Sequence, residues 1–253
     1  MIIALTNLSY KNLNFSEFIK QVCSNNFKYI EIAPTLVSKN FYRDKKKIKK
    51  ILYKEKIEAI SLQSIFYNFK KIDLKNKKDF SNLINYVKKI ISFCSYLKID
   101  NISIGSCPSR KLQGNQSEIY KYNIVFFSKF AEIAKKKNIV ISIEPISKKY
   151  GNLFLNNSYE ALEFIIKLNK KNVKLVLDTG NCKYEKKNFK TFFLKYGKYI
   201  NHIQISDKNI NKLNIHTVKK ELIFFKKKKL NKTTTIEYLS EYGKYSKDLK
   251  NLK

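Results

Sequence analysis

The sequence predicts a single (β/α)8 barrel, the TIM-barrel architecture, on the strength of two observations. Eight short apolar runs recur along the 253 residues at intervals of about 30 to 40 positions. The segments between them are rich in lysine and carry apolar residues at helical spacing. Eight strand–helix units in about 250 residues are typical of this fold. The alternative, a doubly wound open sheet, usually has fewer strands and a glycine-rich first turn, which is missing here.

Each apolar run is a predicted strand, and most are followed by a predicted helix. The helical pattern is clear in FSEFIKQVCSNN after the first run and in NSYEALEFIIKLNKK after the fifth. In the latter, Asn157 or Ser158 with Glu160 or Glu163 is a suitable helix start. No Pro-, Gly- or Ser-rich linker divides the chain, so residues 1–253 are predicted to form one domain. In chain order the predicted strands are 2–6 (IIALT), 29–33 (YIEIA), 57–63 (IEAISLQ), 101–105 (NISIG), 139–144 (IVISIE), 173–178 (VKLVLD), 200–206 (INHIQIS) and 233–237 (TTTIE).

The charge of the chain is strongly unbalanced, with 52 basic and 20 acidic residues and a formal net charge of +32. Such a surplus suggests nucleic acid or an anionic membrane as a partner. However, the only arginines are Arg43 and Arg110, whereas proteins that bind nucleic acid favour arginine for its planar fork. The abundant residues Lys, Asn, Ile, Phe and Tyr all have AT-rich codons. We therefore interpret the surplus as compositional bias and predict neither a nucleic-acid nor a membrane partner.

The cysteines and the N-terminus favour a cytoplasmic protein. The four cysteines show no CxxC pair and no metal-type spacing, which fits a reducing compartment. The apolar run at the N-terminus is too short for a signal peptide. No stretch approaches the ~20 apolar residues of a membrane-spanning helix. Homo-oligomerisation is left open.

Acidic side chains end three of the predicted strands, at Glu144, Asp178 and Glu237. In a barrel these ends meet at the C-terminal mouth, where active sites of this fold lie. The seventh run adds His202 and Gln204, which alternate onto the same strand face. Two or three carboxylates with a neutral N or O donor suit a divalent cation. The alternative for any one acid is a helix cap or a pair with one of the many lysines.

The segment after the fourth run, GSCPSRKLQG, is a candidate anion site. Ser106, Ser109 and backbone N–H groups could receive an anion, and Arg110 could bind it through a bidentate fork. The alternative is a surface turn with an incidental arginine. The segment is not a P-loop, because GxxxxGK[ST] is absent.

The chain resembles the xylose isomerase-like TIM barrels in four segments that occur in the same order. These are IVISIEPISKKYGNLFLNNSYEALEFI, VKLVLDTGNC, INHIQISD and TTTIEYL. This superfamily includes sugar and sugar-phosphate isomerases and epimerases and also endonuclease IV. ISLQSIFYNF and GSCPSRK resemble a bacterial subgroup of sugar phosphate isomerases/epimerases, which has a GSPKNR-like loop at the latter position. The resemblance covers nearly the whole chain and implies one divalent metal ion (Mn, Mg, Co or Zn) held by Glu144, Asp178, Gln204 and Glu237. Much of the superfamily has histidine where this chain has Gln204.

The resemblance also implies a reaction, in which a proton is removed from the carbon next to a carbonyl and returned. A divalent metal would stabilise the enediolate charge, and Glu144 and Glu237 would transfer the proton from the two faces of the sugar. The substrate is expected to be a sugar or sugar phosphate. The candidate substrate-binding residues are Arg110, Ser106, Ser109, His202, Gln63, Tyr150 and Asn156.

Two other functions remain as alternatives. An endonuclease IV-like DNA-repair enzyme resembles this barrel but relies on a zinc site built from several histidines. This chain has only His202 and His216, and it has Asn181 rather than histidine after DTG. The second alternative is a non-catalytic or otherwise specialised barrel, such as a sugar-pathway lyase or a binding protein, which Gln204 in place of histidine leaves open.

Overall fold

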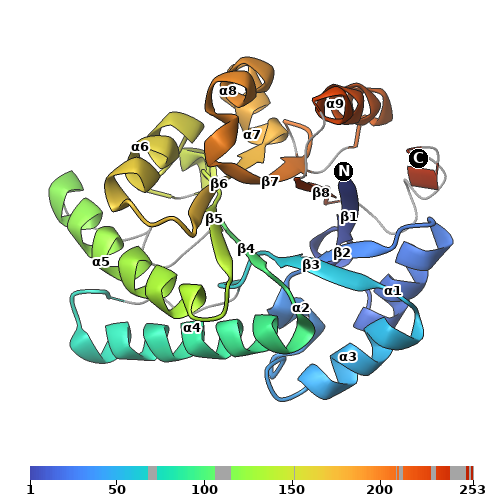
Figure 1. Cartoon of the computed structure of the whole chain (residues 1–253), viewed down its shortest axis with the longest axis horizontal. Helices are drawn as coiled ribbons and strands as arrows, with labels where there is room; N and C mark the ends of the chain where they lie inside the picture. Colours follow the sequence, from blue (N-terminus) through green and yellow to red (C-terminus); the bar gives the residue numbers. More distant parts are fainter. Residues whose placement is uncertain are drawn as a thin grey trace.

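The eight predicted strands form a closed parallel barrel in which each strand pairs with its sequence neighbours and β8 pairs with β1 (Figure 1). The computed structural model describes residues 1–67, 73–105, 115–150, 152–208, 210, 213–228, 232–239, 249–250 and 252. The predicted (β/α)8 barrel is confirmed. The strands are β1 (Ile2–Thr6), β2 (Tyr29–Ile32), β3 (Glu58–Leu62), β4 (Asn101–Ile104), β5 (Val140–Ile143), β6 (Val173–Asp178), β7 (Ile200–Ile205) and β8 (Thr233–Ile236).

The strands alternate between apolar and polar side chains, and this alternation separates two environments. Ile102 and Ile104 in β4 are buried, and so are Ser103 and Gly105 between and after them. Ser103 donates a hydrogen bond to Glu31 of β2, which is not a neighbouring strand. A contact between strands that are not neighbours must cross the inside of the barrel. The polar positions therefore fill the barrel, and the apolar positions face the surrounding helices.

The helices form an outer ring around the barrel (Figure 1). Asparagine caps the N-terminus of six of those described, for example Asn14 at α1 and Asn157 at α6, where a side-chain oxygen accepts from free backbone N–H groups. The predicted helix start at Asn157 is thus confirmed. The helices are α1 (Phe15–Ser24), α2 (Pro34–Val37), α3 (Lys45–Lys54), α4 (Lys77–Leu97), α5 (Gln116–Lys135), α6 (Ser158–Leu168), α7 (Thr179–Tyr184), α8 (Phe189–Tyr196) and α9 (Ile215–Lys227), with short 3-10 turns η1 (Asn7–Tyr10), η3 (Lys148–Tyr150) and η4 (Gly197–Tyr199).

Phenylalanine supplies much of the packing between the helices. Phe126, Phe127 and Phe130 of α5 are fully buried, and Phe127 meets Phe164 of α6 edge to face at a centroid distance of 5.5 Å. Each fully buried ring of this size contributes about 1.5–3 kcal/mol from transfer out of water. This layer holds the helices against the barrel and thereby keeps the strand ends in place.

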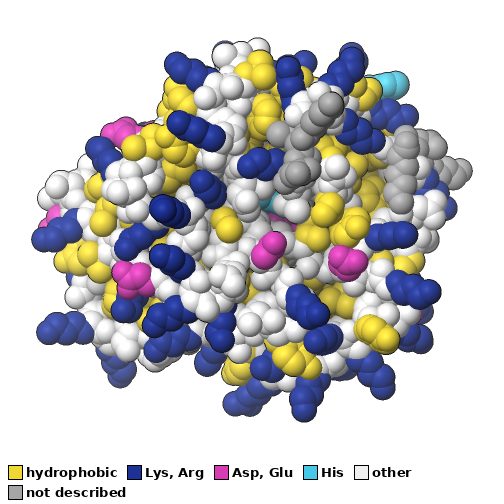
Figure 2. All heavy atoms as spheres, in the orientation of Figure 1, with side chains coloured by type: hydrophobic (Ala, Val, Ile, Leu, Met, Phe, Trp, Pro, Cys, Tyr) yellow, Lys and Arg dark blue, Asp and Glu magenta, His cyan; other side chains and the backbone are white. Residues whose placement is uncertain are grey.

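Lysine dominates the outer faces of the helices. In α3 (KKKIKKILYK) only Ile48 and Leu52 are buried, so the lysines lie toward solvent. Figure 2 shows Lys and Arg side chains spread around the visible face, with few acidic ones. Among the described residues, no helix combines the length and apolar character that crossing a membrane requires.

Candidate active site

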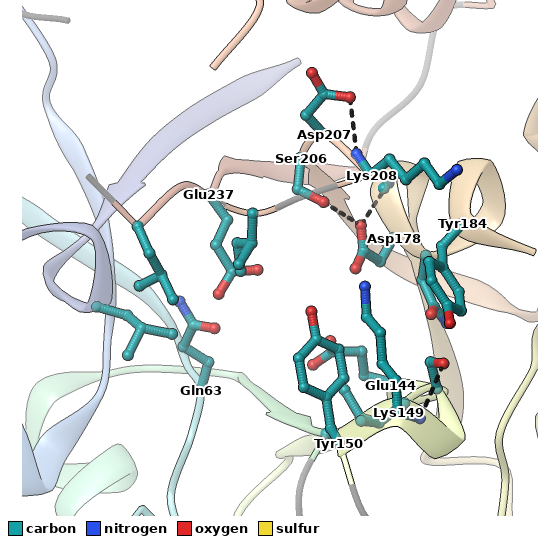
Figure 3. A pocket seen from close by; sticks show the side chains of 18 of the residues that line it. Gln63, Glu144, Lys149, Tyr150, Asp178, Tyr184, Ser206, Asp207, Lys208 and Glu237 are labelled. Atoms are coloured by element: carbon teal, nitrogen blue, oxygen red, sulfur yellow. Dashed lines mark hydrogen bonds between the residues drawn. The ribbon is translucent and has the colours of Figure 1, made fainter. Parts of the chain in front are cut away.

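A pocket of about 260 Å³ opens at the carboxyl ends of the strands (Figure 3). The residues that end or follow six of the eight strands line it: Gln63, Gly105, Glu144, Asp178, Ser206 and Glu237. One cavity is therefore shared by the three acids predicted at strand ends, Glu144, Asp178 and Glu237. The carboxyl ends of the strands are the usual place for the active site of this fold.

Asp178 is held rigidly at the end of β6. Its Oδ1 accepts hydrogen bonds from Ser206 Oγ at 2.6 Å and from the backbone N–H of Gly180 at 2.8 Å, so it also caps α7. A Cβ at position 180 would lie 2.1 Å from Ser206 Oγ, so glycine is required for this close approach. Burial raises the pKa of Asp178, although these hydrogen bonds and the charge of Lys183 act against the increase.

Glu144 follows β5 and packs closely against β4. A Cβ at position 105 would lie 2.5 Å from Glu144 Oε2, so Gly105 provides the space that the carboxylate occupies. The backbone N–H of Glu144 donates to Ile104 O at 2.9 Å, which continues the sheet one residue beyond the strand. The carboxylate is thus placed against the pocket wall by backbone geometry rather than by a flexible loop.

Glu237 follows β8 and is 4% exposed. Burial is the largest cause that raises its pKa well above the ordinary value, and the carboxylates of Glu144, Asp178 and Glu31 raise it further. The charges that act on Glu237 are therefore all negative. A bound cation would relieve this repulsion and favour the ionised form.

The structure places His202 and Gln204 below the pocket, which differs from the expected position at the mouth. Both are fully buried, and neither lines the cavity. His202, Gln204 and Ser206 lie on the same face of the strand, and successive residues on one face are roughly 7 Å apart along it. Only Ser206, the last of the three, reaches the pocket. His202 instead contacts Glu31 Oε1 through Nε2 at 3.2 Å and Thr233 Oγ1 through Nδ1 at 2.7 Å.

Gln204 is oriented by its acceptors. Its Nε2 donates to Glu31 Oε2 at 3.4 Å and to Gln63 Oε1 at 3.3 Å. Because an ionised carboxylate only accepts hydrogen bonds, the NH2 end of the amide must face Glu31. Gln204 Oε1 then has no hydrogen-bond partner in the described part of the chain, although it is buried.

The donor chemistry of these residues fits a divalent cation. Three carboxylates and an unpartnered amide oxygen are hard oxygen donors, which suit Mg²⁺ or Mn²⁺. Their spacing is wider than that of an assembled ligand shell: within the described residues, no three His, Cys, Asp or Glu side chains are grouped closely enough to hold a metal ion.

Lys149 and two tyrosines form the lip of the pocket. Lys149 Nζ lies 3.8 Å from the ring centroid of Tyr184 and 4.8 Å from that of Tyr150, and all three residues line the cavity. Tyr150 was predicted from the sequence, whereas Lys149 and Tyr184 were not. The available signal was the position of Lys149 shortly after a strand end, but it stands in a chain with 50 lysines.

The remaining predicted site residues lie in different places. Gln63 lines the pocket and donates a hydrogen bond to Thr6 Oγ1. Asn156 does not line it, because its Nδ2 is bound to Ile146 O and Asn152 O in the segment before α6. Ser106, Ser109 and Arg110 lie outside the described residues.

Comparison with known proteins identifies relatives by sequence profile and by fold. The profile of the family described as xylose isomerase-like TIM barrel matches residues 19–223. No curated protein matches the chain significantly. Similar solved structures include 3-keto-D-glucoside 4-epimerase from E. coli, with a TM-score of 0.78, 13% identity and coverage of 100% of this chain and 97% of that one.

Two further solved structures have the same fold. One is a D-psicose 3-epimerase determined in the presence of D-fructose, with a TM-score of 0.77, 16% identity and coverage of 99% of this chain and 89% of that one. The other is the IolI protein with a bound zinc atom, with a TM-score of 0.74, 16% identity and coverage of 100% and 95%. At these identities the likeness concerns the fold.

Proposed function

The chain belongs to the xylose isomerase-like TIM barrel family, and we propose that it is a metal-dependent isomerase or epimerase of a sugar or sugar phosphate. The observation that carries this proposal is the convergence of Glu144, Asp178 and Glu237 on one pocket at the strand ends. Structures with the same fold include sugar epimerases, which supports the substrate class.

In the proposed reaction Glu144 and Glu237 transfer a proton at the carbon next to the substrate carbonyl. They follow β5 and β8, and Figure 3 shows them on different walls of the cavity. One carboxylate would remove the proton and the other would return it, to the opposite face in an epimerisation. Both are largely buried, so little bulk water surrounds the two carboxylates.

The other pocket residues would bind and orient the sugar. Gln63 Nε2 is bound to Thr6, and its Oε1 to Gln204, so its amide plane is fixed. Tyr150 presents its hydroxyl toward the cavity (Figure 3). A divalent metal held by the pocket carboxylates of Glu144, Asp178 and Glu237, with the buried Gln204 Oε1 below the pocket as the proposed fourth ligand, would polarise the carbonyl and stabilise developing negative charge.

Arg110, Ser106 and Ser109 remain proposed anion-binding residues, and His202 and Asn156 are now proposed to act indirectly. His202 would hold Glu31, which orients Gln204. Asn156 would hold the segment that follows β5 and carries Lys149 and Tyr150, because it bonds Ile146 O and Asn152 O on either side of them.

The decisive experiment measures exchange of a substrate C–H proton with D₂O over a panel of ketoses and ketose phosphates. We expect exchange by the wild-type protein with added Mn²⁺, Mg²⁺, Co²⁺ or Zn²⁺, and a loss of about 10²–10⁴-fold in Glu144→Gln and Glu237→Gln. Glu163→Gln is the matched control, since Glu163 is an exposed glutamate paired with Lys167 on α6.

Binding of metal is tested separately by thermal unfolding after chelation. Adding back a divalent ion should raise the midpoint, since ligands of the native state stabilise it by mass action. The proposal is wrong if no ion stabilises the protein. It is also wrong if both glutamine variants retain full exchange. The alternative of a non-catalytic sugar-binding barrel predicts sugar binding without exchange.

A further inference from the structure

Lys149 is the second residue of η3 (Lys148–Tyr150), directly at the lip of the pocket. Its ammonium group lies between two tyrosine rings, 3.8 Å from the centroid of Tyr184 and 4.8 Å from that of Tyr150. Figure 3 shows the side chain extended along the cavity between these rings. Cation–π contacts of this kind hold an ammonium group in place without neutralising its charge.

The positive charge of Lys149 is not neutralised by a salt bridge within the described structure. Among the described residues Lys149 forms no ion pair, whereas Lys183 nearby is bound to Glu221 Oε1 at 2.7 Å and to Ser206 O at 2.7 Å. The ammonium group of Lys183 therefore links α7 to the end of β7 and to α9. The ammonium group of Lys149 contacts the rings of Tyr150 and Tyr184 and, within the described residues, no carboxylate at ion-pair distance, so it remains able to bind a ligand.

The pocket is divided electrostatically between floor and lip. Glu144 and Glu237 are 9% and 4% exposed, and with Asp178 they make the floor acidic. Lys149 and Lys208 are exposed and line the lip together with the half-buried Asp207. An anionic group would be repelled by the floor and attracted to the side of the lip that Lys149 forms, whereas hydroxyl groups can bind at both.

We propose that Lys149 binds an oxyanion group, a phosphate or a carboxylate, at the end of the substrate remote from the reacting carbon. This inference rests on the proposed function, because it assumes that the carbonyl end of a sugar occupies the acidic floor. An ammonium group is a compact point charge with three donors, which suits phosphate and carboxylate oxygens. The Tyr150 hydroxyl, which points into the cavity, can donate a further hydrogen bond (Figure 3). The substrate is then a sugar phosphate or a sugar acid rather than a neutral sugar.

The test measures binding of inorganic phosphate and of acetate by calorimetry, without any sugar. We expect phosphate or acetate to bind, and binding to fall at least tenfold in Lys149→Gln and to be largely kept in Lys149→Arg. Lys148→Gln is the matched control, since Lys148 is the exposed neighbour in η3 that does not line this pocket. It should bind within twofold of the wild type. Arg110→Gln is measured in parallel.

The outcomes separate the sources of the anion and the possible failures. Preference for phosphate indicates a sugar phosphate, and preference for acetate indicates a sugar acid. The inference is overturned if neither anion binds, if Lys149→Gln binds as the wild type does, or if only Arg110→Gln weakens binding. Failure of the proposed function would instead appear as absent C–H exchange for every sugar, with anion binding still dependent on Lys149.

Discussion

Two buried carboxylates in the same barrel, Glu31 in the interior and Glu237 at the mouth, have opposite electrostatic environments. Burial alone would raise the pKa of both. At Glu31, the charge of His202 and hydrogen bonds from His202, Ser61 and Ser103 outweigh burial and lower the pKa. At Glu237, neighbouring carboxylates add to burial and raise it.

This difference separates a structural part of the barrel from a functional one. Around Glu31 the chain supplies its own counter-charge and donors, so this carboxylate is compensated without a ligand. Around Glu237 the neighbouring charges have the same sign as its own, so the mouth gains stability when a cation or a donor from outside arrives. Perturbed groups left uncompensated in a cleft are typical of functional sites.

The largest expected effect on the free energy of unfolding comes from separating Glu31 from His202. His202→Leu leaves the charge of Glu31 buried without its partner, and we expect the free energy of unfolding to fall by about 3–5 kcal/mol. Urea unfolding measures this loss. The double variant Glu31→Gln/His202→Leu should recover much of it, because neither charge is then buried alone. A loss below about 1 kcal/mol in His202→Leu would contradict the assignment.

Removing a carboxylate at the mouth of the barrel is expected to increase stability rather than decrease it. When it is ionised, Glu237 is one of several mutually repelling carboxylates, so in the presence of a chelator and at a pH above its raised pKa we expect Glu237→Gln to increase stability by about 1–2 kcal/mol. The same variant should lose proton exchange, and thus gain stability at the cost of activity. Glu163→Gln, on the exposed face of α6, should change stability by less than about 0.5 kcal/mol. Destabilisation by Glu237→Gln would show that the mouth is compensated after all.

The smallest expected effect concerns Glu185, whose environment contains charges of both signs. It is half-buried, and both of its carboxylate oxygens have no hydrogen-bond partner in the described structure. Burial, followed by the charge of Glu160, raises its pKa to about 7. The native state therefore holds this proton more tightly than the unfolded chain does. Its stabilisation is complete below the unfolded-state value near 4.5 and is lost as pH rises through about 7.

Between pH 5 and 8 we expect the free energy of unfolding to decrease by about 1 kcal/mol from this group, after allowing for solvent screening. Glu185→Gln should remove that part of the pH dependence. Chemical unfolding of both proteins across this range measures it. Identical pH profiles for the two proteins would assign the dependence to other groups.

Much of the site was predictable because its signals are local. A carboxylate at the end of an apolar run is visible in the chain at Glu144, Asp178 and Glu237, and the barrel brings all strand ends to one face. Glu31 carries a similar signal, an acid inside YIEIA, but the sequence does not show that His202 lies against it. Lys149 was hidden by the abundance of lysine, since only its position at the pocket distinguishes it from Lys148.

The sequence by itself determined the eight strand–helix units and which strands end in acids. Strand alternation, helix spacing and asparagine caps act over a few residues and are therefore present in the local pattern. Only the closure of the barrel decided which polar side chains meet. Ser103 reaches Glu31 across 72 positions, and Gln204 reaches it across 173. Such contacts depend on the register of the strands and on the position of a residue along its strand. Closure of the barrel therefore gives Glu31 a positively charged partner and hydrogen-bond donors, whereas it surrounds Glu237 with other carboxylates.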